Sequence, residues 1–173
     1  MKTAETTPLP YRPCVGIMVL NRDGLVWIGR RADGPTDAEG RGTWWQMPQG
    51  GIDEAEDPRA AAKRELLEET GMTTVEIIAE STDWHFYDLP PDLAGKAWGG
   101  RYRGQRQKWF AVRFLGHDRE INITPQAPHQ IEFDAWTWAS PSEVLRLIVP
   151  FKRIVYDAVF EEFASLAQPE KPR

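Results

Sequence analysis

The sequence has very little cysteine, because Cys14 is the one cysteine among its 173 residues. A lone cysteine cannot form a disulfide within the chain, and it cannot supply the ligands of a cysteine-rich zinc site. A disulfide scaffold and a zinc finger are therefore excluded. This cysteine usage is typical of proteins in a reducing compartment, so we expect a cytoplasmic protein.

Long hydrophobic runs are also absent. The longest run, residues 14–20, is far shorter than the roughly 20 apolar residues of a membrane-spanning helix. The residues before it contain no apolar stretch of the kind found in secretion signals. We therefore expect no membrane segment and no classical export signal.

The sequence has fewer basic than acidic residues: 21 Lys and Arg against 26 Asp and Glu, which gives a net charge of −5. Proteins that coat long nucleic acids need a broadly basic surface. We expect no DNA partner and a monomeric protein. The charge still leaves room for a small site that binds the end of a polyanion.

What the sequence contains fits one globular domain, with 41% hydrophobic and 27% charged residues. Residues 1–10 are polar and contain proline, which predicts a flexible arm, with ordered structure beginning near Tyr11. A short tail is expected at residues 168–173. The ordered domain is therefore expected to span residues 11–167.

Apolar periodicity and turn residues predict an α/β (α+β) domain with a mixed sheet and helices. Strands are expected at residues 14–20, 25–28, 75–79, 84–87, 107–115 and 133–139. The turn at residues 21–24 predicts a hairpin between the first two strands. A Pro/Gly-rich excursion covers residues 89–104, and helices are expected after Ser140 and over residues 152–166.

One further helix carries complete start and stop signals. Asp57 suits the N-cap, Pro58 the first helical position and Gly71 the position just past the end. Within it, Glu65, Glu68 and Glu69 stand at i, i+3 and i+4, so their carboxylates share one helix face. An isolated pattern of this kind is usually a solvated charged face.

The context favours a metal site instead. A glycine-rich segment, Pro48-Gln-Gly-Gly51, enters just before the helix, and Arg64 can pair with one of the acids. Clustered oxygen ligands without Cys or His indicate a hard cation such as Mg²⁺ or Mn²⁺, and such cations accompany phosphate substrates.

At these residues the chain resembles the Nudix hydrolase family. The segment GGIDEAEDPRAAAKRELLEETGM places every position of that family's motif: Gly50, Glu56, Arg64, Glu65, Leu66, Glu68, Glu69, Gly71 and Met72. Seven of these are fixed identities, which would coincide by chance at a given start less than roughly once in 10⁷. The resemblance implies a Nudix fold, a mixed β-sheet sandwiched between helices.

The resemblance extends beyond this motif over about residues 11–166. Segments including Trp45-Gln-Met-Pro-Gln-Gly-Gly51, Gly104-Gln-Arg-Gln-Lys-Trp-Phe110 and Phe151-Lys-Arg153 are similar to the branch of bacterial RNA pyrophosphohydrolases and dinucleoside polyphosphate hydrolases. The Pro/Gly excursion is similar to that of the plant and alphaproteobacterial members. The implied activity is cleavage of phosphoric anhydrides.

The resemblance also implies roles for the acidic residues. It assigns two or three divalent ions, Mg²⁺ or Mn²⁺, to the metal ligands Gly50, Glu65, Glu68, Glu69 and Glu132. On sequence alone, Glu132 would be an ordinary surface acid. Glu65 and Glu69 are the candidate catalytic residues, with Glu65 favoured as general base and Glu69 as a bridge between metals.

The remaining candidates bind substrate or hold the motif together. Arg12, Arg30 and Lys152 match phosphate contacts, although each could be a plain surface cation. The neighbouring Arg31 is expected to face away from Arg30. Tyr87 and Phe151 could stack on a nucleobase or pack in the core. Glu56, Arg64 and Gly71 are read as structural members of the motif.

Two substrates stay open. The favoured reading is conversion of 5′-triphosphorylated RNA to 5′-monophosphorylated RNA, which promotes RNA decay. The alternative is a dinucleoside polyphosphate such as diadenosine tetraphosphate. The cluster of basic residues at 101–108 could steer an RNA end to the site, or it could be a solvated loop.

Overall fold

A computed structural model describes residues 8–124 and 131–169. Its centre is an eight-stranded sheet with the order β3-β2-β1-β7-β5, to which β4, β6 and β8 add at the sides. Most of the predicted arm and tail, at residues 1–7 and 170–173, lies outside the described residues.

The sheet is mixed. β1 (Tyr11–Leu20) and β7 (Gly104–Phe114) run parallel along the whole length of β1. All other pairs are antiparallel: β1 with β2 (Val26–Arg31) and β4 (Gln49–Gly51), β2 with β3 (Trp45–Gln46) and β8 (Phe133–Ala139), and β7 with β5 (Val75–Glu80) and β6 (His85–Asp88).

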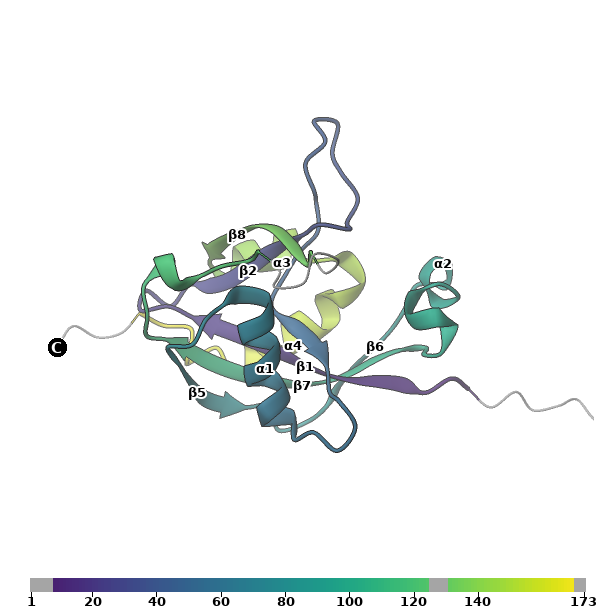
Figure 1. The fold of residues 1–173 in the computed structure, drawn as a ribbon, viewed down its shortest axis with the longest axis horizontal. Helices are drawn as coiled ribbons and strands as arrows, with labels where there is room; N and C mark the ends of the chain where they lie inside the picture. Colours follow the sequence, from purple (N-terminus) through teal and green to yellow (C-terminus); the bar gives the residue numbers. More distant parts are fainter. Residues whose placement is uncertain (1–7, 125–130, 170–173) are drawn as a thin grey trace, which may run out of the picture.

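Helices cover both faces of the sheet, as Figure 1 shows with α1 (Pro58–Thr70) in front and α4 (Arg153–Glu162) behind. Along β1, Val15, Ile17 and Val19 belong to the core cluster beside α1, whereas Met18 and Leu20 belong to the cluster beside α4. This alternation follows from the two-residue period of a strand. The expected class, an α+β domain with a mixed sheet between helices, is confirmed.

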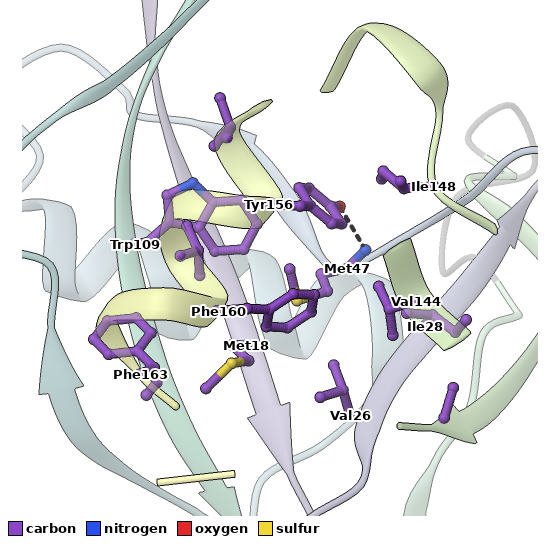
Figure 2. Close-up of a cluster of buried hydrophobic side chains, with 14 of the residues drawn as sticks. Met18, Val26, Ile28, Met47, Trp109, Val144, Ile148, Tyr156, Phe160 and Phe163 are labelled. Carbon is purple, nitrogen blue, oxygen red and sulfur yellow. Dashed lines mark hydrogen bonds between the residues drawn. The ribbon is translucent and has the colours of Figure 1, made fainter. Parts of the chain in front are cut away.

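The core beside α4 is closed by aromatic and aliphatic side chains (Figure 2). Tyr156 is fully buried there, and its hydroxyl accepts a hydrogen bond of 2.8 Å from the Met47 backbone N–H. This bond ties the segment before β4 to α4. It also satisfies a polar atom that would otherwise destabilise the core.

The predicted ends of α1 are confirmed. The Asp57 carboxylate accepts from the Ala60 N–H, and Gly71 closes the helix in the left-handed conformation at φ 71°. α3 (Pro141–Leu147) begins at Ser140 as expected, because the Ser140 hydroxyl accepts from the Glu143 N–H. α4 ends at Glu162, earlier than the predicted residue 166.

The excursion after β6 contains two short helices, α2 (Pro91–Ala94) and η1 (Ala97–Gly100). Two more 3-10 turns lie at η2 (Asp118–Glu120) and η3 (Pro150–Lys152). Figure 1 shows α2 beyond the end of the sheet, at the tip of the ribbon formed by β6 and β7. No helix in the two described ranges has the length and apolar character that crossing a membrane requires.

Candidate active site

The site lies where the sheet divides. β1 pairs with β4 at residues 14–16 but with β2 at Leu20, and β7 pairs with β6 at its start and with β5 at its end. A cavity of about 920 Å³ opens among the diverging strands, α1 and η3. Its size suits a ligand as large as a nucleotide.

Five acidic side chains line this cavity: Glu65, Glu68 and Glu69 from α1, Asp33 from the segment after β2, and Glu132 from the segment before β8. The acids of α1 differ in exposure: the Glu65 side chain is 13% exposed, whereas that of Glu68 is 57% exposed. Glu132 is exposed as a residue. The structure therefore brings together acids that are more than sixty residues apart in the sequence.

Their surroundings favour protonation. Loss of hydration raises the pKa of Glu65 to about 7, although Arg64 opposes that shift. The pKa of Glu69 lies well above its usual range because of burial, and the charges of Glu132 and Glu65 raise it further. Among residues 8–124 and 131–169, the one N–H that donates to the Glu69 carboxylate is that of Gln49, at 3.3 Å. A cation would relieve this repulsion.

Arg64 fixes the loop before α1. Its guanidinium makes a fork to Glu56 at 2.9 and 2.8 Å and donates to the Gly51 carbonyl at 2.9 Å. It also pairs with Glu65 at 2.9 Å and Glu68 at 3.4 Å. Arg64 lowers the pKa of Glu56 to about 2, which keeps that carboxylate charged. The fork expected from the sequence is therefore present.

The two glycines of β4 leave room for charged side chains. A Cβ at Gly50 would collide with the Glu65 carboxyl, and one at Gly51 would collide with the Arg12 guanidinium. Glycine at both positions therefore lets an acid and a cation approach the same strand. Gly50 therefore lies beside Glu65.

Within residues 8–124 and 131–169, no group of three or more His, Cys, Asp or Glu side chains is spaced to hold a metal ion. Arg64 instead occupies oxygens of Glu65 and Glu68. The candidate ligands nevertheless fit a hard divalent cation by their chemistry, because the side-chain atoms that would bind it are all carboxylate oxygens. Within the described part of the chain, the Glu69 carboxylate accepts a hydrogen bond only from the Gln49 N–H.

Lys152 also lines the cavity, is 2% exposed and donates to the side-chain oxygens of Gln46 at 2.9 Å and Gln49 at 3.0 Å. Burial, with Arg31 nearby, lowers its pKa to about 7. A phosphate group would favour the charged form, because an anion stabilises an ammonium group.

Buried amides hold Lys152 in place. The Trp109 indole N–H donates to the side-chain oxygen Oε1 of Gln107 at 3.1 Å. Because an indole can only donate, this bond fixes the orientation of the Gln107 side-chain amide. The Gln107 amide N–H₂ then donates to Gln105 at 2.8 Å and Gln49 at 3.2 Å. Gln49 thus accepts from Lys152 through its side chain and donates to Glu69 through its backbone.

Arg31, rather than Arg30, reaches the cavity, so the expected position of Arg30 is corrected. Arg30 pairs with Asp134 at 2.6 Å and does not line the cavity, whereas Arg31 lines it and pairs with Asp33 at 2.7 Å. The two side chains do diverge as predicted. The pairing of β2 with β8 shifts in register between them, which the sequence does not reveal.

Aromatic side chains form the walls. Tyr87 and Phe151 have ring centroids 5.9 Å apart, and Trp44 meets Phe151 edge-on at 5.9 Å. Tyr87 is 8% exposed and joins the core, while Phe151 is partly buried, so both line the cavity to different degrees.

Sequence reasoning missed Arg31, Trp98 and the glutamines that surround Lys152 as parts of the site. One signal was available, since Gln105, Gln107 and Trp109 alternate along one strand and so share a face. Arg12, a candidate phosphate contact, lines the cavity, with its guanidinium carbon 5.4 Å from the centroid of the Trp98 ring.

Comparison with known proteins supports these observations. A family model for the NUDIX domain matches residues 10–159. The RNA pyrophosphohydrolase of Agrobacterium fabrum is 55% identical over 167 residues, covering 95% of this chain and 98% of the relative. That of Brucella ovis is 58% identical over 161 residues, covering 92% and 90%.

Solved structures show the same fold at low sequence identity. The E. coli dihydroneopterin triphosphate pyrophosphohydrolase has a TM-score of 0.65 at 20% identity, covering 88% of this chain and 99% of that one. A binary complex of the C. elegans Ap4A hydrolase has a TM-score of 0.58 at 16% identity, covering 88% and 98%. Both show similarity of fold alone.

Proposed function

Because this chain belongs to the NUDIX family, we propose that it is an RNA pyrophosphohydrolase that converts 5′-triphosphorylated RNA to 5′-monophosphorylated RNA and so promotes RNA decay. The observation that carries the proposal is the shared cavity, which the acids of α1 and Lys152 line together. The high identity to proteins named RNA pyrophosphohydrolase over nearly their whole length supports RNA as the substrate.

NUDIX hydrolases generally use divalent metal ions, and we propose two to three Mg²⁺ or Mn²⁺ ions for this chain. Gly50, Glu65, Glu68, Glu69 and Glu132 would hold them. When bound, such ions lower the pKa of a water molecule and neutralise phosphate oxygens.

The protein's own side chains bind the substrate and move the proton. Lys152, Arg12 and Arg31 would contact phosphate oxygens, and Phe151 with Tyr87 would contact the first base; all five side chains line the cavity. Glu65 is our candidate for the general base, on the family resemblance and because its carboxyl group lines the cavity from α1. We propose that a monomer acts in this way in the cytoplasm, on RNA rather than DNA.

Hydrolysis of dinucleoside polyphosphates is the second candidate. The cavity of about 920 Å³ has aromatic side chains on two sides, which suits a ligand with two bases. Both substrates would bind the same residues through their phosphates, and they differ in the nucleoside or nucleotides attached beyond those phosphates.

The deciding experiment compares kcat/KM on a triphosphorylated oligoribonucleotide and on diadenosine tetraphosphate in the same magnesium buffer. We expect the RNA to be the better substrate. A clear preference for diadenosine tetraphosphate would favour the second candidate, and no turnover of either would overturn both.

A further inference from the structure

Within the excursion between β6 and β7, α2 and η1 contribute side chains to the cavity. α2 and η1 contain no buried residue. Leu93, Lys96, Ala97 and Trp98 nevertheless line the cavity. Trp98 is half-buried, but no side chain of these two short helices packs against the core clusters, so its position at the cavity calls for another explanation.

The backbone at Trp98 is unusual. Its φ of 50° and ψ of 36° place it in the left-handed region, which a bulky residue seldom adopts, and Gly99 and Gly100 follow at φ 66° and 71°. Among the described non-glycine residues, only Ala55 shares a positive φ. Such conformations cluster at sites that bind ligands, where they direct a side chain.

The indole of Trp98 contacts a cation and a second aromatic ring. The Arg12 guanidinium carbon is 5.4 Å from its centroid, and the Tyr102 ring meets it edge-on at 6.2 Å. The one hydrogen bond found for the Arg12 side chain within the described ranges goes to the Cys14 sulfur, at 3.6 Å. Arg12 is therefore available to an anion, and Trp98 adjoins the place where that anion would lie.

We propose that Trp98 forms a second base-binding subsite, which takes the nucleoside beyond the first one while Arg12 contacts the phosphate between them. This rests on the proposed function and specifies its substrate further. Aromatic side chains bind bases by stacking on them regardless of sequence. The ligand is a nucleoside joined through phosphate, either the second nucleotide of an RNA or the second nucleoside of a dinucleoside polyphosphate.

The test compares Trp98→Ala and Trp98→Phe on three substrates: ATP, which has one base, a triphosphorylated dinucleotide, and diadenosine tetraphosphate. For Trp98→Ala we expect kcat/KM to fall about 10-fold on the dinucleotide, equivalent to about 1.4 kcal/mol, and less than about 2-fold on ATP. Trp98→Phe keeps an aromatic face and should restore most of the rate. Asp92→Ala, at an exposed position of α2, is the matched control.

The outcomes separate the alternatives. A loss confined to the dinucleotide assigns the subsite to RNA, and a loss confined to diadenosine tetraphosphate assigns it to a dinucleoside polyphosphate. An equal loss on ATP would mean that Trp98 only supports Arg12, and no loss would mean that it is a surface residue; either overturns the proposal. Calorimetric binding of the same ligands needs no turnover, so it tests Trp98 even if the wild-type protein hydrolyses none of them.

Discussion

At the scale of single residues, the acids of α1 carry the first prediction. Glu65 and Glu69 line the cavity rather than the core, so Glu65→Gln and Glu69→Gln should each leave the fold intact and lower kcat by at least ~10²-fold. The measurement is the rate of RNA turnover alongside the circular dichroism spectrum. Glu161→Gln, an exposed change on α4, is the control. Normal turnover by either folded variant would contradict the assignment.

Lys152 makes the stability of the metal-free protein depend on pH. Burial lowers its folded pKa from 10.5 to about 7, with Arg31 acting in the same direction and Glu132, Cys14 and Glu69 opposing it. Between these two pH values the unfolded chain binds more protons than the folded protein, so this group makes stability rise with pH. Below pH 7 Lys152 is charged in both states, so the folded protein bears the full cost of burying its charge.

Lys152→Met should therefore remove the contribution of this group to the pH dependence of the free energy of unfolding, which is at most about 1.4 kcal/mol per pH unit. Denaturant unfolding of both proteins in chelator at pH 7, 8 and 9 measures it. We expect the variant to gain stability over the wild type most strongly at pH 7. Parallel curves for the two proteins would show that Lys152 stays charged throughout.

At the scale of elements, the sequence predicted those features that interactions between neighbouring residues determine. α1 was predictable to its caps because Asp57, Pro58 and Gly71 act within a few residues of the helix ends. The short strands β3 and β4 were not predicted, since their pairing partners lie in β2 and β1, and no propensity marks residues 49–51 as a strand. The position of Arg31 depends on a register shift that is likewise non-local.

The contact between β4 and α1 gives the third prediction. A methyl group at Gly50 would collide with the Glu65 carboxyl, so Gly50→Ala should displace that side chain and lower kcat at least ~10-fold while the protein stays folded. Gly95→Ala is the matched control, because a Cβ there meets nothing within 4 Å. Equal activity of the two variants would show that Glu65 need not approach β4.

At the scale of the whole molecule, the site exists because distant segments meet where the sheet divides. The family motif located Glu65, Glu68 and Glu69, and the resemblance added Lys152, which the fold brings to the same cavity. The buried amides and Trp98 were beyond prediction, since their roles arise only when β7, η3 and the excursion after β6 lie around one cavity.

The charge of the whole molecule governs how much of an RNA it reads. With a net charge of −5 and four cationic side chains lining the cavity, the protein should contact only the first few nucleotides. A short triphosphorylated oligonucleotide should then be cleaved almost as well as a long transcript with the same unpaired 5′ end. For the same reason, kcat/KM should depend only weakly on salt concentration.

Pairing the 5′ end into a blunt hairpin should suppress cleavage, because stacked bases cannot reach Phe151 or Trp98. Timing phosphate release from matched short, long and hairpin-ended RNAs at several salt concentrations tests both expectations, with the long unpaired transcript as the reference. A strong preference for length together with a steep salt dependence would reveal an extended basic track that the charge balance argues against. Indifference to pairing would mean that the aromatic walls do not hold bases and would favour a substrate recognised through its phosphates alone.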